Sequence, residues 1–314
     1  MEKGDQSIDF QLLVRQMKPD EVAESVQMFS EAGLHDSPST VEAFYQYDPK
    51  RFIVAVDEDK NQIVGCCAAP VTTHDTAFLG LYVVDKCYQR LGIGVKVFKQ
   101  CISAVGDRNC GLGAVPAKFD IYKNRAGFNV EEGSSLVITQ GIPKGIERLK
   151  TLDKLNNPKL QLRKLISVEY DEDLVQKIIA FDEQVHLDNR DKLLRYCLAK
   201  EDTVTYAVID SDSNQVIGYG CIRPDSIDRA MPGPLYAMDD DIAEIILGQL
   251  LRCDSCFNDE VSFFTSSKSV GGLRLAKEVL NLTEAERCAK LYTRTIPPFN
   301  YDMQYACHTP DFAC

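Results

Sequence analysis

Several signals that would assign this chain to a specialised class of protein are absent from its 314 residues. No segment approaches the ~18 consecutive apolar residues of a membrane-spanning helix. The stretch 1–9 is charged and polar and lacks the apolar core of a secretory signal peptide. Basic residues are not in excess, because the formal net charge is -12, which argues against nucleic acid or an anionic membrane as the main partner. We therefore expect a cytoplasmic protein that binds neither nucleic acids nor membranes.

Metal and nucleotide motifs are scarce as well. The chain has 12 cysteines, but Cys253 and Cys256 form a lone Cys-x-x-Cys with no second pair at zinc spacing, so we expect no metal site. In a cytoplasmic protein these thiols stay reduced. The sequence contains neither Gly-x-Gly-x-x-Gly nor Gly-Lys-Ser/Thr, which argues against a dinucleotide enzyme and against a P-loop.

The chain does contain a strand, a glycine turn and a helix in direct succession. Phe78–Val84 is a short apolar run with β-branched and aromatic residues, which predicts a buried strand, and residues 95–105 repeat apolar positions at helical spacing. Between them, Gly92 and Gly94 permit positive φ and close approach of a ligand, and Arg90 adds a positive charge. Because free amides at a helix start carry partial positive charge, this turn is typical of a phosphate cradle.

This unit resembles the coenzyme-binding signature of the GNAT family of acyl-CoA-dependent N-acetyltransferases. The signature is Gln or Arg, two residues, Gly, one residue, and Gly or Ala, directly after the fourth strand, and Gln89, Gly92 and Gly94 match it. The resemblance implies a splay between the fourth and fifth strands, where the backbone of Tyr82, Val83 and Val84 would contact the acetyl carbonyl and pantetheine. It also implies that acetyl-CoA is the cofactor and that its pyrophosphate is held by the loop residues Gln89, Arg90, Leu91, Gly92, Ile93 and Gly94.

The order of predicted elements extends the resemblance to a whole domain. Residues 1–141 read as strand, two helices, three strands, helix, strand, helix, strand, which is the GNAT order. Residues 142–162 are polar and contain Pro and Gly, so they read as a linker. Residues 163–314 repeat the pattern in outline, and Gly233–Met238 and Lys290–Arg294 resemble the C-terminal domain of YitH/HolE-type acetyltransferases. We expect an α/β (α+β) fold of two tandem GNAT-like domains, each with a mixed, mostly antiparallel sheet flanked by helices.

The second copy departs from the first at the turn that would hold the coenzyme. Asp239, Asp240 and Asp241 stand where the first copy has its glycine turn. Three carboxylates would repel a pyrophosphate, and they suit the capping of the next helix. We therefore expect the second domain to lack a pyrophosphate site and either to wall one side of the substrate cleft or to mediate a homodimer.

Two side chains are the candidate catalytic groups. The resemblance implies that Tyr122, on the helix before Gly127, protonates the leaving thiolate, although Tyr122 precedes Gly127 by five residues where the family usually has four. Simple packing of Tyr122 is the alternative. No carboxylate occurs in residues 77–84 of the central strand, so His74 is the predicted base, because imidazole titrates near neutral pH. Deprotonation through water, without a dedicated base, is a second possibility.

These features predict an N-acetyltransferase that moves an acetyl group from acetyl-CoA to an amine of a small molecule or peptide. The spacing of Tyr122 and the missing strand carboxylate leave another hypothesis open. This is a non-catalytic acyl-CoA-binding or scaffold protein that keeps the phosphate cradle without the chemistry. Turnover of acetyl-CoA with a panel of amines distinguishes the two.

Overall fold

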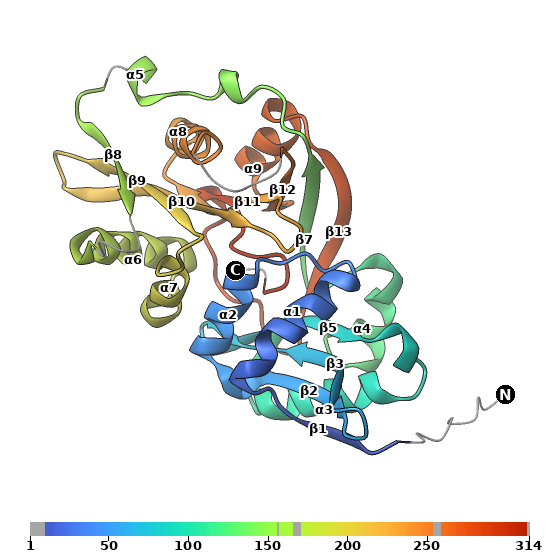
Figure 1. The fold of residues 1–314 in the computed structure, drawn as a ribbon. Helices are drawn as coiled ribbons and strands as arrows, with labels where there is room; N and C mark the ends of the chain where they lie inside the picture. The colour runs from blue at the N-terminus through green and yellow to red at the C-terminus, as the bar shows by residue number, and fades with distance from the viewer. Residues whose placement is uncertain (1–9, 156, 166–170, 254–258, 313–314) are drawn as a thin grey trace.

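The computed structural model describes residues 10–155, 157–165, 171–253 and 259–312. The chain forms two α/β halves that share one mixed, mostly antiparallel sheet, with helices packed on both of its faces (Figure 1). Within the described ranges, no helix combines the length and the apolar character that crossing a bilayer requires. The predicted fold class, an α/β protein with flanked, mostly antiparallel sheets, is confirmed.

The first half follows the predicted order of elements to within a few residues. The structure adds one short strand that the sequence analysis did not predict, β4 (Val71–Thr73), which pairs with the central strand β5. The remaining helices and strands are β1 (Leu12–Gln16), α1 (Val22–Glu31), α2 (Pro38–Tyr47), β2 (Phe52–Asp57), β3 (Gln62–Ala68), β5 (Thr76–Val84), α3 (Ile93–Val105), β6 (Asn109–Ala114), α4 (Phe119–Arg125) and β7 (Val130–Gly141).

Strand alternation explains how helices come to cover both faces of this sheet. Successive side chains of a strand point to opposite faces. In β2, Phe52, Val54 and Val56 therefore pack against α1 and α2, whereas Ile53 and Ala55 pack against α3. Every residue of β2 is buried, which accounts for its nearly continuous apolar sequence.

The second half repeats this plan and continues the same sheet. Residues 142–162, predicted as a linker, contain the short helix α5 (Leu152–Leu155) and the start of β8. Residues 166–170 and Cys256 lie outside the described residues. The elements that follow are β8 (Leu160–Leu165), α6 (Glu172–His186), α7 (Asp191–Leu198), β9 (Val204–Asp210), β10 (Gln215–Pro224), β11 (Ala230–Ala237), α8 (Asp240–Leu250), β12 (Val261–Ser266), α9 (Val270–Arg274), a π-helical turn (Leu275–Val279), β13 (Thr283–Tyr292) and β14 (Gln304–Ala306).

The two halves exchange strands where their sheets meet. The strand order is β1-β2-β3-β5-β6-β13-β7-β12-β11-β10-β9-β8. β13, from the end of the chain, lies between β6 and β7 of the first half, while β7 lies between β12 and β13 of the second half. Each half thus supplies a strand that completes the sheet of the other, and the two halves form one continuous structure. The division into domains at residues 142–162 stays a prediction.

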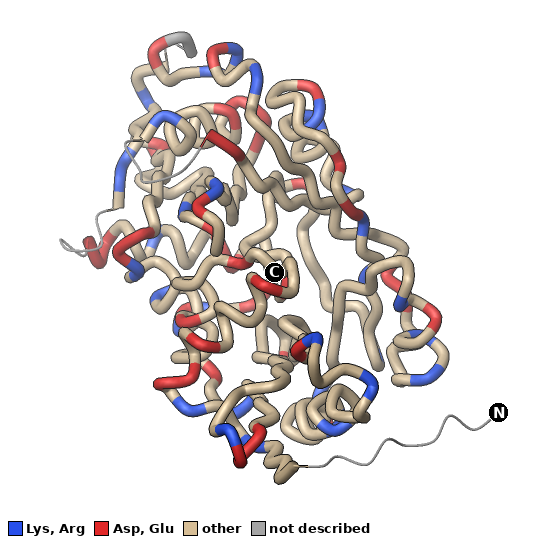
Figure 2. Tube along the Cα trace, turned by 45° about the vertical axis from the view of Figure 1, so that its right-hand side comes forward, with Lys and Arg blue, Asp and Glu red and all other residues tan. Residues whose placement is uncertain are grey.

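Charged side chains of both signs are distributed over the molecule. In the view of Figure 2, Lys and Arg positions are interspersed with Asp and Glu positions along both halves. Many of them pair locally, as Arg195 does with Glu172 and Asp191. Because such exposed pairs contribute only ~0.2–1 kcal/mol each, the stability of the fold depends mainly on its apolar cores.

Candidate active site

The turn between β5 and α3 has the backbone geometry of an anion cradle. Arg90 and Gly92 adopt left-handed conformations, with φ of 68° and 77°. Gly92 is the N-cap residue of α3, and no side chain caps this helix start, whose first turn also contains no acidic residue. The first amides of α3 are therefore left without side-chain acceptors, and together with the helix dipole they favour a bound anion.

Glycine is required at the two signature positions for different structural reasons. A Cβ on Gly92 would meet no atom within 4 Å, so Gly92 is required by its positive φ and leaves open space in front of the amides. A Cβ on Gly94 would lie only 2.6 Å from the hydroxyl oxygen of Tyr82. Gly94 thus allows β5 and α3 to approach each other. Gln89 supports the same junction, because its Nε2 donates a hydrogen bond of 3.1 Å to the carbonyl oxygen of Val84.

β5 separates from β6 just before this turn. The parallel pairing of the two strands runs from Thr76–Asn109 to Leu79–Leu112 and ends there. β5 continues to pair with β3 on its other edge as far as Val84, with an irregularity in register beside Leu81, whose φ is 51°. A positive φ is rare for a leucine and marks a bulge. Beyond Leu79, no strand in the described part of the chain pairs with the edge of β5 that faced β6, as expected for the splay that the resemblance implied.

A cleft of about 1050 Å³ runs from the turn through this splay to the junction of the two halves. Its walls come from β5, α3, β6 and α4 of the first half, from β7, and from β12 and β13 of the second half. The lining includes Gly80, Leu81, Tyr82, Val84, Gln89, Val95, Phe98, Lys99, Leu112, Lys118, Tyr122, Arg125, Leu136, Ile138, Phe264, Glu286, Cys288 and Asp311. A volume of this size can hold a large, extended ligand.

The predicted coenzyme residues fall into three groups around this cleft. Tyr82, Val84 and Gln89 line it. Val83 points to the opposite face of the sheet and is buried with α1 and α2, so only its backbone remains available on the open edge. The turn beside the cleft consists of Arg90, Leu91, Gly92, Ile93 and Gly94, none of which is among the residues that line it. Ile93 anchors this turn because its side chain is buried under α3.

Tyr122 lies in the cleft despite its unusual spacing. α4 is short and ends at Arg125, and the ring of Tyr122 packs against Phe98 and Phe128, with centroid separations of 6.4 and 6.3 Å. Burial raises the pKa of Tyr122 to about 12, so its hydroxyl is protonated at neutral pH. Tyr82 on β5, whose pKa burial also raises, packs against the same Phe98 ring. Both phenols line the cleft and are thus candidate proton donors.

His74, the predicted base, is not among the residues that line this cleft. It occupies the tight turn between β4 and β5 with a φ of 46°, and its Nε2 lies 2.9 Å from the carbonyl oxygen of His186. Its backbone amide and the hydroxyl of Thr73 donate hydrogen bonds to Asp188. His74 therefore contributes to the contact between the two halves, and a base has to be sought among the groups of the cleft itself.

Several polar residues of the cleft were missed by the sequence analysis. Lys99, Lys118 and Arg125 bring positive charge to it from α3 and from the start and end of α4. Isolated basic residues on exposed helix faces carry no signal that distinguishes them in a sequence. Asp311 and Glu286 reach the cleft from the far end of the chain, and only the strand exchange and the path of the last residues bring them there.

The corresponding region of the second half is closed. Asp239 caps α8 as predicted, accepting a hydrogen bond of 2.9 Å from the amide of Ile242. Asp240 and Asp241 pair with Arg274 and Lys150. Among the described residues, β11 pairs with β12 at Ala230–Val261, and β14 pairs with β11 at Leu235 and Tyr236. The gap that serves as a cleft in the first half is thus filled by the chain itself in the second.

Comparison with known proteins matches both halves of the chain to GNAT acetyltransferases. The model described as "Acetyltransferase (GNAT) family" matches residues 20–117, and the one described as "Acetyltransferase (GNAT) domain" matches residues 178–306. No curated protein matches the sequence at a significant level. The YitH/HolE subtype is not confirmed and stays a prediction.

Solved structures with the same fold span the whole chain. A protein from Pyrococcus horikoshii named as an acetyltransferase has a TM-score of 0.71 and 17% identity, with 99% of this chain and 100% of that chain covered. A tandem GNAT protein from the clavulanic acid biosynthesis pathway has a TM-score of 0.58 and 12% identity, covering 90% and 98%. N-myristoyltransferase from Saccharomyces cerevisiae, solved with myristoyl-CoA, has a TM-score of 0.58 and 11% identity, covering 95% and 84%. At these identities the similarity concerns the fold.

Proposed function

This chain carries two GNAT acetyltransferase domains in tandem, and from that premise we propose that it is an acyl-CoA-dependent N-acyltransferase that moves an acetyl group from acetyl-CoA to an amine. The observation that supports this most is the continuity of one cleft. Gln89 and Val95, which flank the uncapped start of α3, the open edge of β5 and Tyr122 all line the same cleft.

In this proposal the first half holds the coenzyme. The amides of residues 89–94 bind the pyrophosphate, and Arg90 and Lys99 add positive charge nearby. The backbone of Tyr82, Val83 and Val84, on the edge of β5 that lacks a partner strand, orients the pantetheine and polarises the thioester carbonyl. Tyr122 donates a proton to the departing sulfur, for which a protonated phenol is suited.

In this proposal the second half does not bind the coenzyme and shapes the acceptor site. Its three aspartates would repel a pyrophosphate in the equivalent place, and β14 pairs with the edge of β11 that corresponds to the open edge of β5. Its strands β12 and β13, together with β7, form the wall of the cleft opposite β5, where the acceptor amine would enter. We assign to it the shaping of the acceptor site. A small molecule and a peptide terminus both remain compatible with a site of this size.

Two measurements on the purified full chain test the proposal. Isothermal titration with acetyl-CoA should show binding at one site, and release of free thiol should accelerate when amines and amino acids are added as a panel. Binding with no turnover on any acceptor would favour the non-catalytic acyl-CoA-binding alternative. Absence of coenzyme binding would refute both.

A further inference from the structure

The last described residues of the chain pass from the second half into the cleft of the first. β14 pairs with β11, and the amide of Cys307 donates a hydrogen bond of 2.8 Å to the carbonyl oxygen of Phe264 on β12. Beyond Cys307 the chain leaves this sheet and runs toward α2 and β5. We call residues 307–312 the crossing segment.

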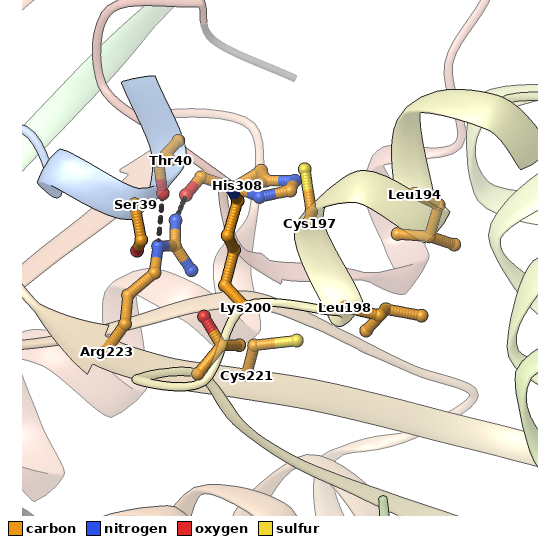
Figure 3. Close-up of a pocket in the computed structure, with 10 residues that line it drawn as sticks. Ser39, Thr40, Leu194, Cys197, Leu198, Lys200, Cys221, Arg223 and His308 are labelled. Atoms are coloured by element: carbon orange, nitrogen blue, oxygen red, sulfur yellow. Dashed lines mark hydrogen bonds between the residues drawn. The ribbon is translucent and has the colours of Figure 1, made fainter. Parts of the chain in front are cut away.

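Arg223 holds the first part of the crossing segment. Its side chain, 2% exposed, donates hydrogen bonds to Thr40 on α2, to the carbonyl oxygen of Gly233 on β11 and to the carbonyl oxygen of His308. Figure 3 shows the guanidinium between Thr40 and His308, next to a small cavity that Cys197, Lys200 and Cys221 also line. One buried cation thus ties both halves of the molecule to the crossing segment.

The other end of the crossing segment is anchored in the first half. The hydroxyl of Thr309 donates a hydrogen bond to the buried carboxylate of Asp36. Phe312 is fully buried, with its ring centroid 4.7 Å from that of Phe44 and 6.2 Å from that of Phe52. Because anchors lie on both sides of it, Asp311 has little freedom to move away from its place.

Asp311 lies where β5 separates from β6. Asp311 Oδ1 accepts a hydrogen bond of 3.2 Å from the amide of Leu81, the residue at the bulge. The backbone of Asp311 lies so close to β5 that a Cβ on Gly80 would be 2.3 Å from the carbonyl oxygen of Asp311. Asp311 lines the cleft and also faces Cys288 of β13, on the acceptor side. Its carboxylate therefore lies between the open edge of β5 and Cys288 of β13.

We propose that Asp311 is the general base of this site and takes the proton from the acceptor ammonium. This inference rests on the acyltransferase function proposed above. The carboxylate accepts one N–H proton, and the neutral amine then attacks the thioester carbonyl. The C–N bond forms as the C–S bond breaks, the thiolate takes a proton from Tyr122, and the second proton lost by the amine passes through water to Tyr122. The net result is one amide, one free thiol and one proton, which Asp311 releases to solvent.

The environment of Asp311 supports this assignment. Burial, followed by repulsion from the carboxyl of Asp36, raises the pKa of Asp311 to about 7, although the hydrogen bond from Leu81 works in the opposite direction. A base with a pKa near the working pH is suited to proton transfer. The other titratable or charged groups that face this part of the cleft are Cys288 on β13, His35 before α2, and Arg229, which is paired with Asp225.

Two other groups of the cleft are less suited to the task. The Nδ1 of His35 lies 3.2 Å from the hydroxyl oxygen of Ser226, and burial, followed by the charge of Arg229, lowers the pKa of His35. Glu286 is exposed and belongs to the part of β13 that pairs with Ile138 of β7, away from the splay. Neither hydrogen-bonds to the open edge of β5, as Asp311 does.

The test compares Asp311→Asn with the wild-type chain. Asn keeps an oxygen that can accept from Leu81, so the fold and the coenzyme site should be retained. We expect kcat/KM to fall at least 100-fold, with the Kd for acetyl-CoA within threefold of wild type. In the wild type, kcat/KM should rise with pH to a plateau with a midpoint near 7, measured with an acceptor whose own amine does not titrate between pH 5 and 9. Asp311→Asn should lack this rise.

Three comparisons keep the outcome unambiguous. Asp302→Asn, at an exposed position shortly before the crossing segment, is the matched control and should keep both the rate and the pH profile. Asp311→Glu, which keeps a carboxylate on a longer side chain, should recover part of the rate and the pH-dependent rise. The inference is overturned if Asp311→Asn retains activity within threefold, or if Glu286→Gln abolishes the rise instead. A wild type that binds acetyl-CoA but acetylates no amine would overturn the proposed function and, with it, the base.

Discussion

The sharpest test of the coenzyme site is a change of charge at Gly92. Gly92→Asp and Gly92→Asn introduce side chains of nearly the same volume, and both residue types tolerate the left-handed conformation better than most. A Cβ at this position meets no atom within 4 Å. The two variants should therefore fold equally well, and they differ in one negative charge placed at the start of α3.

The expected magnitude follows from the distance between that charge and a bound diphosphate. Two like charges about 4 Å apart repel by about 1 kcal/mol in water and by about 4 kcal/mol at the effective dielectric of a protein surface. This range corresponds to a factor of roughly 5 to 1000 in Kd. We expect Gly92→Asp to bind acetyl-CoA at least about fivefold more weakly than Gly92→Asn in isothermal titration, with the difference shrinking as salt is raised from 50 to 500 mM.

A matched control lies at the other end of the same helix. Ser103 is exposed in the last turn of α3, about 16 Å from Gly92 along the helix axis. This exceeds the screening length of about 10 Å at 0.1 M salt. Ser103→Asp and Ser103→Asn should therefore bind acetyl-CoA equally. Equal affinities for the two Gly92 variants would mean that no phosphate lies at this turn, and the coenzyme would have to bind elsewhere.

Three further expectations concern the proton donor, the crossing segment and the titration of Asp311. Tyr122→Phe should lower kcat at least tenfold while the Kd for acetyl-CoA stays within threefold, and a drop in Tyr82→Phe alone would reassign the donor to β5. Arg223→Met should lower the free energy of unfolding, measured in urea, by about 3 kcal/mol, because two buried carbonyl oxygens lose their hydrogen-bond donor. The control Arg287→Met breaks an exposed ion pair with Glu284 and should lower this free energy by less than about 1 kcal/mol. In the unfolded chain the pKa of an Asp carboxyl is ~3.9. Between this pH and about 7, the folded protein therefore binds more protons than the unfolded chain, and its stability falls as pH rises. The Tm of Asp311→Asn relative to wild type should therefore increase from pH 4 to pH 8, and a difference independent of pH would contradict the raised pKa.

Local patterns predicted most of the secondary structure and one side of the site. The apolar run of β5, the helical spacing of α3 and the two glycines between them are properties of neighbouring residues, and the structure places them as expected. The cap at Asp239 is local in the same way, because a side chain and an amide three residues later determine it. The predicted roles of Tyr122 and of residues 82–94 remain to be tested by the variants above.

The proposed base, Asp311, is not marked by any local pattern in the sequence. His74 follows a turn and precedes the central strand, which makes it a sensible choice in a sequence, yet its ring lies against the second half, at the carbonyl oxygen of His186. Asp311 is 230 residues away from Leu81 along the chain, and nothing in its immediate neighbours marks it. The sequence contains the carboxylate but does not indicate which distant backbone amide it will meet.

The amino-acid sequence alone therefore predicts the repeating units and the turn suited to an anion, because helix periodicity, strand alternation and glycine φ depend on only a few neighbouring residues. Only the tertiary structure decided that β13 lies between β6 and β7, that β14 closes the second cleft, and that Asp311 enters the first. The pairing of strands and the path of the crossing segment depend on the packing of surfaces far apart in the chain, and neither composition nor spacing carries that information.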